Sequence, residues 1–150
     1  MKKTCTVLFS LLGVLMLTGC IGENYKFYPP SVSLNTSLIF EELIEVNSEW
    51  EGEGNKQLVK TTDDWFSFAK EQPTITITSG EEIGFVLEHE DYLLYDTKVT
   101  LWTMEKEKSD LYVEEDGSID LPNVKGEYVL EFNLDTDAGE AQYVAHLLLK

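Results

Sequence analysis

The segment from Gly126 to Leu149, GEYVLEFNLDTDAGEAQYVAHLLL, decides the fold class. Apolar and polar side chains alternate along its first half, and the alternation resumes after a polar, glycine-containing stretch at residues 135–139. A period of two predicts a pair of half-buried β-strands joined by a turn. The apolar set is Tyr128, Leu130, Phe132, Leu134, Ala141, Tyr143, Ala145, Leu147 and Leu149.

The same alternation recurs earlier in the chain. Threonine alternates with isoleucine in residues 74–79, and apolar residues alternate again in 83–87 and 99–104. Glu114-Glu115-Asp116-Gly117 ends on an Asp-Gly pair, which favours a tight hairpin between Val113 and Ile119. Short alternating strands separated by turns predict an all-β fold, an immunoglobulin-like antiparallel β-sandwich of about seven strands over residues 31–150.

The pattern is less clear between residues 31 and 72. Residues 31–34 and 43–50 can each be strands, the second with Ile44, Val46 and Trp50 on one face. Residues 40–46 could instead form a short helix, because glutamate and leucine favour helix. Trp50 and Trp102 are expected to fill the core.

Three aromatic residues gather in a loop-like stretch that is otherwise polar. Trp65, Phe66 and Phe68 lie within residues 65–70, for which we expect a loop or a single helical turn. Clustered exposed aromatic side chains often mark a contact surface, so these three are candidate contact residues. The alternative is that the segment packs onto the sandwich.

A local pattern around Tyr128 supports the sandwich. Residues 121–130, LPNVKGEYVL, resemble the tyrosine corner of immunoglobulin-like domains, in which a tyrosine hydroxyl bonds to backbone a few residues upstream. The alternative is that Tyr128 is simply an aromatic residue in a strand.

The N-terminus has the layout of an export signal. Lys2 and Lys3 precede a mostly apolar run at residues 7–17, which is too short to span a membrane permanently. The sequence that follows resembles the lipobox of bacterial lipoproteins, Leu17-Thr18-Gly19-Cys20. That resemblance implies a diacylglycerol on the Cys20 sulfur and cleavage before Cys20 by signal peptidase II. The alternative is an ordinary secretory signal with a chance cysteine.

The lipobox also defines the expected domains. Residues 1–19 are the signal peptide, residues 20–30 a lipidated tether, and residues 31–150 one sandwich domain. The chain has two cysteines. Cys5 leaves with the signal and Cys20 carries lipid, so the mature chain has no disulfide. Two acyl chains suffice for stable anchoring, so we expect the protein on the extracytoplasmic face of the cell membrane.

The composition is strongly acidic, with 28 Asp and Glu residues against 11 lysines and a formal net charge of −17. Nucleic acid is an unsuitable partner, because phosphate binding needs a basic surface. Acidity promotes solubility at a crowded surface and would also attract a cationic partner or a divalent metal ion.

The C-terminal half resembles a group of small, uncharacterised lipoproteins of bacilli and related bacteria. Their pattern comprises a Pro-x-x-[IV] strand, a Gly-[ED] turn before an IxF strand, a strand ending in Leu-Trp, a GxYxLE segment and a closing Gly-x-Ala-x-Tyr strand. The resemblance implies an immunoglobulin-like fold and carries no catalytic residue. The matching residues are Pro73, Ile75, Gly80, Glu81, Ile83, Phe85, Leu101, Trp102, Leu121, Pro122, Gly126, Tyr128, Leu130, Glu131, Gly139, Ala141 and Tyr143.

Several clusters of acidic residues and histidines are candidate sites of chemistry. Asp135, Asp137 and Glu140 resemble part of a calcium loop but lack the spacing of an EF-hand. Paired carboxylates could serve a glycoside hydrolase, yet no apolar pocket is evident around them. His89 and His146 have no serine in a nucleophile-elbow context and are too few for zinc.

We therefore expect a non-enzymatic, lipid-anchored interaction module without a cofactor, whose partners are the membrane, through Cys20, and another envelope protein. A small-ligand or calcium-binding surface module is the alternative, and an envelope hydrolase is a third. Fold alone does not choose among them.

Overall fold

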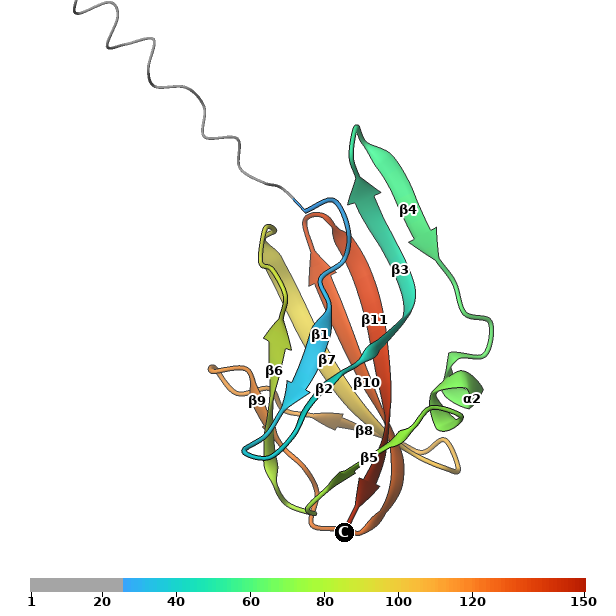
Figure 1. Ribbon diagram of the computed structural model, residues 1–150, viewed down its shortest axis with the longest axis vertical. Helices are drawn as coiled ribbons and strands as arrows, with labels where there is room; N and C mark the ends of the chain where they lie inside the picture. The colour runs from blue at the N-terminus through green and yellow to red at the C-terminus, as the bar shows by residue number, and fades with distance from the viewer. Residues whose placement is uncertain (1–25) are drawn as a thin grey trace, which may run out of the picture.

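Two β-sheets face one another in the computed structural model, which describes residues 26–150 (Figure 1). The prediction of an all-β, two-sheet fold is confirmed. Eleven strands are present in the described part of the chain, more than the seven expected, because several are edge strands of three to five residues.

The larger sheet has seven strands, in the order β4-β3-β11-β10-β7-β8 with β5 paired to β11. All pairs are antiparallel except β5 and β11, which run parallel. The long pair β10–β11 lies at the centre and matches the segment that predicted the fold. The strands are β3 (Ile44–Gly52), β4 (Lys56–Lys60), β5 (Thr74–Ile77), β7 (Leu94–Thr103), β8 (Lys108–Leu111), β10 (Gly126–Thr136) and β11 (Gly139–Leu149).

The smaller sheet has four strands, in the antiparallel order β2-β1-β6-β9. The strands are β1 (Val32–Asn35), β2 (Phe40–Glu42), β6 (Glu82–Leu87) and β9 (Ser118–Asp120). Residues 40–46 are thus mostly strand, and the helix considered for them does not form. Leucine and glutamate favour helix only weakly, and pairing with β1 and β11 overrides that preference.

The core lies between the two sheets. Leu130, Phe132 and Leu134 of β10 are almost fully buried there, and they pack against residues of the smaller sheet such as Leu34 and Ile83. Alternation along β10 and β11 therefore sends one set of side chains into the core and the other set to the outer face of the larger sheet.

The segment at residues 114–117 forms a turn, in which Glu114 N–H donates to the Ser118 carbonyl at 2.8 Å. It does not join two paired strands, and the predicted hairpin is wrong. β8 pairs with β7 in the larger sheet, whereas β9 pairs with β6 in the smaller one. The chain crosses from one sheet to the other here, which a local turn sequence cannot reveal.

β3 contains a β-bulge, so the prediction that Ile44, Val46 and Trp50 share one face is wrong. Asn47 pairs with Gln142 and Glu45 with Tyr143, so Val46 has no partner across the strand. The extra residue reverses the alternation. Trp50 is buried between the sheets, as expected, but Ile44 and Val46 belong to a separate apolar cluster on the outer face.

That outer cluster lies under a short helix, α2 (Trp65–Lys70). The helix begins at Asp64, whose carboxylate accepts a hydrogen bond from Ser67 N–H at 3.1 Å. Trp102 packs here with Phe66 and Trp65, at ring-centroid distances of 6.3 and 5.7 Å. Trp102 is therefore outside the main core, contrary to prediction, because it alternates with the inward-facing Leu101 along β7.

One end of the fold is named the tether end, because the described chain begins there (Figure 1). Lys26 and Phe27 line a hollow together with residues of the β3–β4 turn, such as Asn55, and of the β10–β11 turn, such as Asp137. Buried Tyr143 holds the start of the domain to β11, donating a 2.6 Å hydrogen bond to the Pro30 carbonyl.

Candidate functional site

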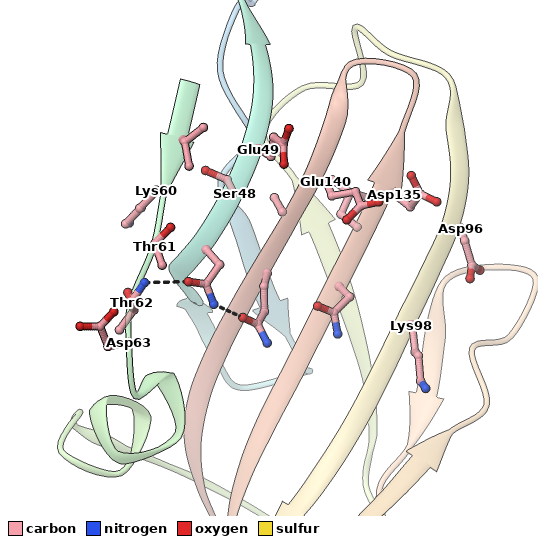
Figure 2. Close-up of a pocket in the computed structure, with 16 residues that line it drawn as sticks. Ser48, Glu49, Lys60, Thr61, Thr62, Asp63, Asp96, Lys98, Asp135 and Glu140 are labelled. Atoms are coloured by element: carbon pink, nitrogen blue, oxygen red, sulfur yellow. Dashed lines mark hydrogen bonds between the residues drawn. The ribbon is translucent and has the colours of Figure 1, made fainter. Parts of the chain in front are cut away.

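The outer face of the larger sheet carries an open groove of about 690 Å³. Figure 2 shows that its floor is formed by β3, β11, β10 and β7, with residues 60–63 along one side. Side chains on this face come from the polar positions of the alternating strands, so the pattern that builds the core also builds the groove.

The first cross-strand row of the groove consists of four carboxylates. Register places Glu140 directly opposite Glu49 on one side and Asp135 on the other, and Asp135 is in turn opposite Asp96. Neighbouring strands lie about 4.8 Å apart, and like charges directly opposite one another destabilise a sheet. We call Glu49, Glu140, Asp135 and Asp96 the carboxylate row; all four are exposed (Figure 2).

The second row, two residues further along each strand, consists of amides. Asn47, Gln142 and Asn133 lie opposite one another, with Lys98 at the end. Asn47 donates to the Gln142 side-chain oxygen and accepts a 2.7 Å hydrogen bond from Thr62 N–H, which ties residues 61–63 to the sheet (Figure 2).

Glu131, two residues before Asn133 on β10, holds two of these amides in place by hydrogen bonds. Its side chain, in a residue only 8% exposed, accepts hydrogen bonds from Gln142 Nε2 at 2.6 Å, Asn133 Nδ2 at 3.0 Å and Trp102 Nε1 at 2.7 Å. Donors aimed at a buried carboxylate make strong hydrogen bonds. The amides are therefore held in fixed positions before any ligand arrives.

The two lysines that line the groove are engaged elsewhere. Lys98 Nζ lies 2.9 Å from Asp110, and this hydrogen bond raises the pKa of Lys98 and lowers the pKa of the Asp110 carboxyl. Lys60 Nζ donates to the Glu45 carbonyl at 2.5 Å and lies 3.9 Å from its carboxylate. Neither lysine forms a salt bridge with the carboxylate row, although Lys98 also interacts electrostatically with Asp96. A further cationic group would relieve the repulsion within the row.

The structure separates the three acids predicted as a calcium cluster. Asp135 and Glu140 join the carboxylate row, whereas Asp137 accepts a 2.7 Å hydrogen bond from Leu93 N–H. Among residues 26–150, no three His, Cys, Asp or Glu side chains are arranged to hold a metal ion. Asp135 and Glu140 thus belong to a strand pair and Asp137 to the turn that joins it, and calcium binding by these residues stays a prediction.

The predicted aromatic contact residues are largely covered. Phe66 is 5% exposed and packs on the sheet with Val129 and Val144, so that residue is not an exposed contact. Trp65 is half-buried in the same cluster, and Phe68, at 36%, is the most exposed of the three. Apolar side chains on the outward face of β10 and β11 account for this burial, and α2 shields them from water.

Tyr128 lies near the start of β10. Its hydroxyl donates to the Val124 carbonyl, four residues upstream, at 3.2 Å. This contact fixes the connection that leads from β9 into β10.

Neither histidine lines the groove. His89 stands edge-on to Tyr28 and Tyr92, with ring centroids 5.3 and 5.9 Å away. His146 lies on β11 with Nδ1 3.3 Å from Thr74 Oγ1 and Nε2 3.8 Å from a Glu127 oxygen. Both are packed side chains without a neighbouring serine nucleophile in the contacts they make.

The lipobox residues Leu17, Thr18, Gly19 and Cys20 lie outside the described residues. Within residues 26–150, no helix has the length and apolar character needed to cross a bilayer.

Sequence reasoning found Asp135 and Glu140 but missed Glu49, Asp96 and Glu131. These residues come from β3, β7 and the middle of β10, and only strand register assembles them. The only signal in the sequence is that these acids alternate with apolar residues. That alternation indicates that they face outward, but it does not show which residues lie beside them on neighbouring strands.

Comparison of the chain with protein-family models, with curated proteins and with solved structures finds no match.

Proposed function

We propose that this chain is a non-enzymatic interaction module of the cell envelope, anchored by diacylglycerol on Cys20 to the extracytoplasmic face of the membrane. Its domain is proposed to be immunoglobulin-like and related to the bacilli lipoproteins it resembles. The two facing sheets and the Tyr128–Val124 hydrogen bond support that assignment.

The carboxylate row carries the binding proposal. Like charges facing one another across three strand pairs cost stability, and a protein keeps such an arrangement where function requires it. The partner is a protein segment that presents lysine or arginine side chains to the row, while backbone groups of that segment bond to the fixed amides of Asn47 and Asn133.

Binding suits this face better than hydrolysis. A glycosidase acid depends on a desolvated site, whereas all four carboxylates of the row are exposed on an open sheet face. The groove lining contains neither histidine nor cysteine. Its hydrogen-bonded amides and exposed carboxylates suit recognition of a partner of complementary charge.

The anchor is tested by mass spectrometry of the mature N-terminal peptide, with Cys20→Ser as control. The proposal expects Cys20 as the first residue, carrying diacylglycerol. An unmodified thiol on the processed chain, or a cut at another residue, would reject the anchor.

The binding face is tested by photo-crosslinking on intact cells. A photoreactive side chain replaces Val59, which lines the groove on β4, or Val124, an equally apolar exposed residue between β9 and β10. We expect one neighbour to be captured from position 59 and not from position 124, with a basic segment at its site of attachment. Equal capture from both positions would reject the groove as the binding face.

A further inference from the structure

Three exposed apolar residues follow one another at the tether end. Their exposed fractions are 67% for Leu93, 57% for Leu94 and 64% for Tyr95. Leu93 ends the loop that follows β6, and Leu94 and Tyr95 are the first two residues of β7. Large apolar side chains gathered at one exposed spot mark a contact surface. We propose that the loop between β6 and β7, together with the first residues of β7, rests in the interfacial region of the lipid bilayer, so that the domain lies with its tether end on the membrane surface.

The position of the chain's start selects the bilayer as the occupant. Leu93 exchanges hydrogen bonds with Asp137, of 2.7 and 3.1 Å, and Asp137 lines the same hollow as Lys26 and Phe27. Residues 21–25 separate Lys26 from the lipidated Cys20, and six extended residue steps reach about 20 Å at most. The loop is therefore held close to the membrane whenever Cys20 is acylated.

A second surface at the same end has interfacial chemistry. Lys26, Lys56, Tyr28 and Leu58 line a hollow of about 660 Å³ between the start of the chain and the β3–β4 hairpin. Tyrosine is enriched at membrane interfaces, and lysine extends its ammonium to the headgroups while its stem covers apolar surface. This surface would contact headgroups as Leu94 enters the interface.

Charge sets the type of bilayer that the loop prefers. Glu88, Glu90, Asp91 and Asp96 flank the three apolar residues, so an anionic surface repels the loop. Contact is then apolar in origin and is strongest on zwitterionic lipid. Salt screens the repulsion, and contact with anionic vesicles rises with ionic strength.

This inference rests on the proposed acylation of Cys20, and the test separates the two. Acylated full-length protein carrying Leu94→Cys is labelled with an environment-sensitive fluorophore and reconstituted into phosphatidylcholine vesicles that contain a spin-labelled quencher lipid. Leu38→Cys is the matched control, because Leu38 is 91% exposed in the β1–β2 turn, at the end of β1 farther from the tether.

We expect the label at position 94 to be quenched at least twofold more than the label at position 38, with less quenching when the vesicles contain phosphatidylglycerol. Replacing Leu93 and Tyr95 by serine should reduce the quenching at position 94. Equal quenching at the two positions in vesicle-bound, acylated protein would overturn the membrane contact alone. Protein that lacks diacylglycerol and stays free of the vesicles would overturn the anchor as well.

Discussion

Glu140 of β11 lies directly opposite Asp135 of β10, and each has a further carboxylate on its other side, Glu49 and Asp96 respectively. Four acidic side chains thus form one row across four strands. Like charges directly opposite one another destabilise a sheet, and the proposed function derives from this row.

The first prediction concerns the repulsion within the row. Glu140→Gln removes one of the two central charges of the row and should raise the free energy of unfolding by about 0.5 kcal/mol at low salt. The gain should shrink in 1 M salt, where the Debye length is about 3 Å. Thermal melts of the native protein and the variant at both salt concentrations measure this gain in stability. Glu41→Gln, an exposed acid on β2, serves as the control and should change little.

The second prediction concerns Glu131, which accepts three side-chain hydrogen bonds. Glu131→Ala leaves Trp102 Nε1 and two amides without their acceptor and should lower the free energy of unfolding by about 2–3 kcal/mol. Urea unfolding followed by tryptophan fluorescence measures the loss. A change below 0.5 kcal/mol, as expected for an ordinary surface substitution, would show that the network does not hold the groove together.

A third prediction concerns the approach of β3 to β11 at Gly139. Its φ is +143°, and a Cβ placed there would come within 2.1 Å of the Glu49 carbonyl oxygen. Gly139→Ala should therefore destabilise the fold by more than 1 kcal/mol and displace the carboxylate row. Gly54→Ala, in the β3–β4 turn, is the matched control, because it also has positive φ but meets no atom within 4 Å. Equal losses in the two variants would attribute the effect to backbone conformation alone.

The fourth prediction concerns alkaline pH. Burial, reinforced by Glu90 and Asp91, raises the pKa of Tyr92 to about 12. Burial also raises the pKa of Tyr143 well above its usual range. The unfolded chain ionises its tyrosines near pH 10, so it binds fewer protons than the folded chain above that pH, and stability must fall as pH rises from 10 to 12.

Absorbance titration of tyrosinate measures this difference. At pH 11 the folded protein should retain at least two un-ionised tyrosines, and Tyr92→Phe should remove one of them. Complete ionisation near pH 10 without unfolding would contradict the burial of both side chains.

The sequence predicts the central strands, whereas it predicts only part of the candidate site. Leu130, Phe132 and Leu134 alternate with polar residues, and that period alone fixes a strand and its two faces. The bulge at Val46 reversed the faces of β3, and nothing local marks it. The crossing from β8 to β9 depends on pairing with distant strands. An Asp-Gly turn is compatible both with a hairpin and with a connection between two sheets.

The carboxylate row could not be predicted either, because it also depends on pairing between distant strands. Asp135 and Glu140 lie close in sequence and resemble part of a metal cluster, but their neighbours Glu49 and Asp96 are distant in the chain. Which acids face one another depends on register between strands, and register is set by the whole hydrophobic pattern rather than by any motif.

Binding at the carboxylate row is tested most directly by combining the groove crosslinker with neutralisation of the row. A photoreactive side chain at Val59 is compared on intact cells in the native background and in the Asp135→Asn, Glu140→Gln double variant, which should fold at least as stably. If a basic segment binds the carboxylate row, the double variant should lose capture of that partner at least fivefold. Undiminished capture by the neutralised row would contradict this binding.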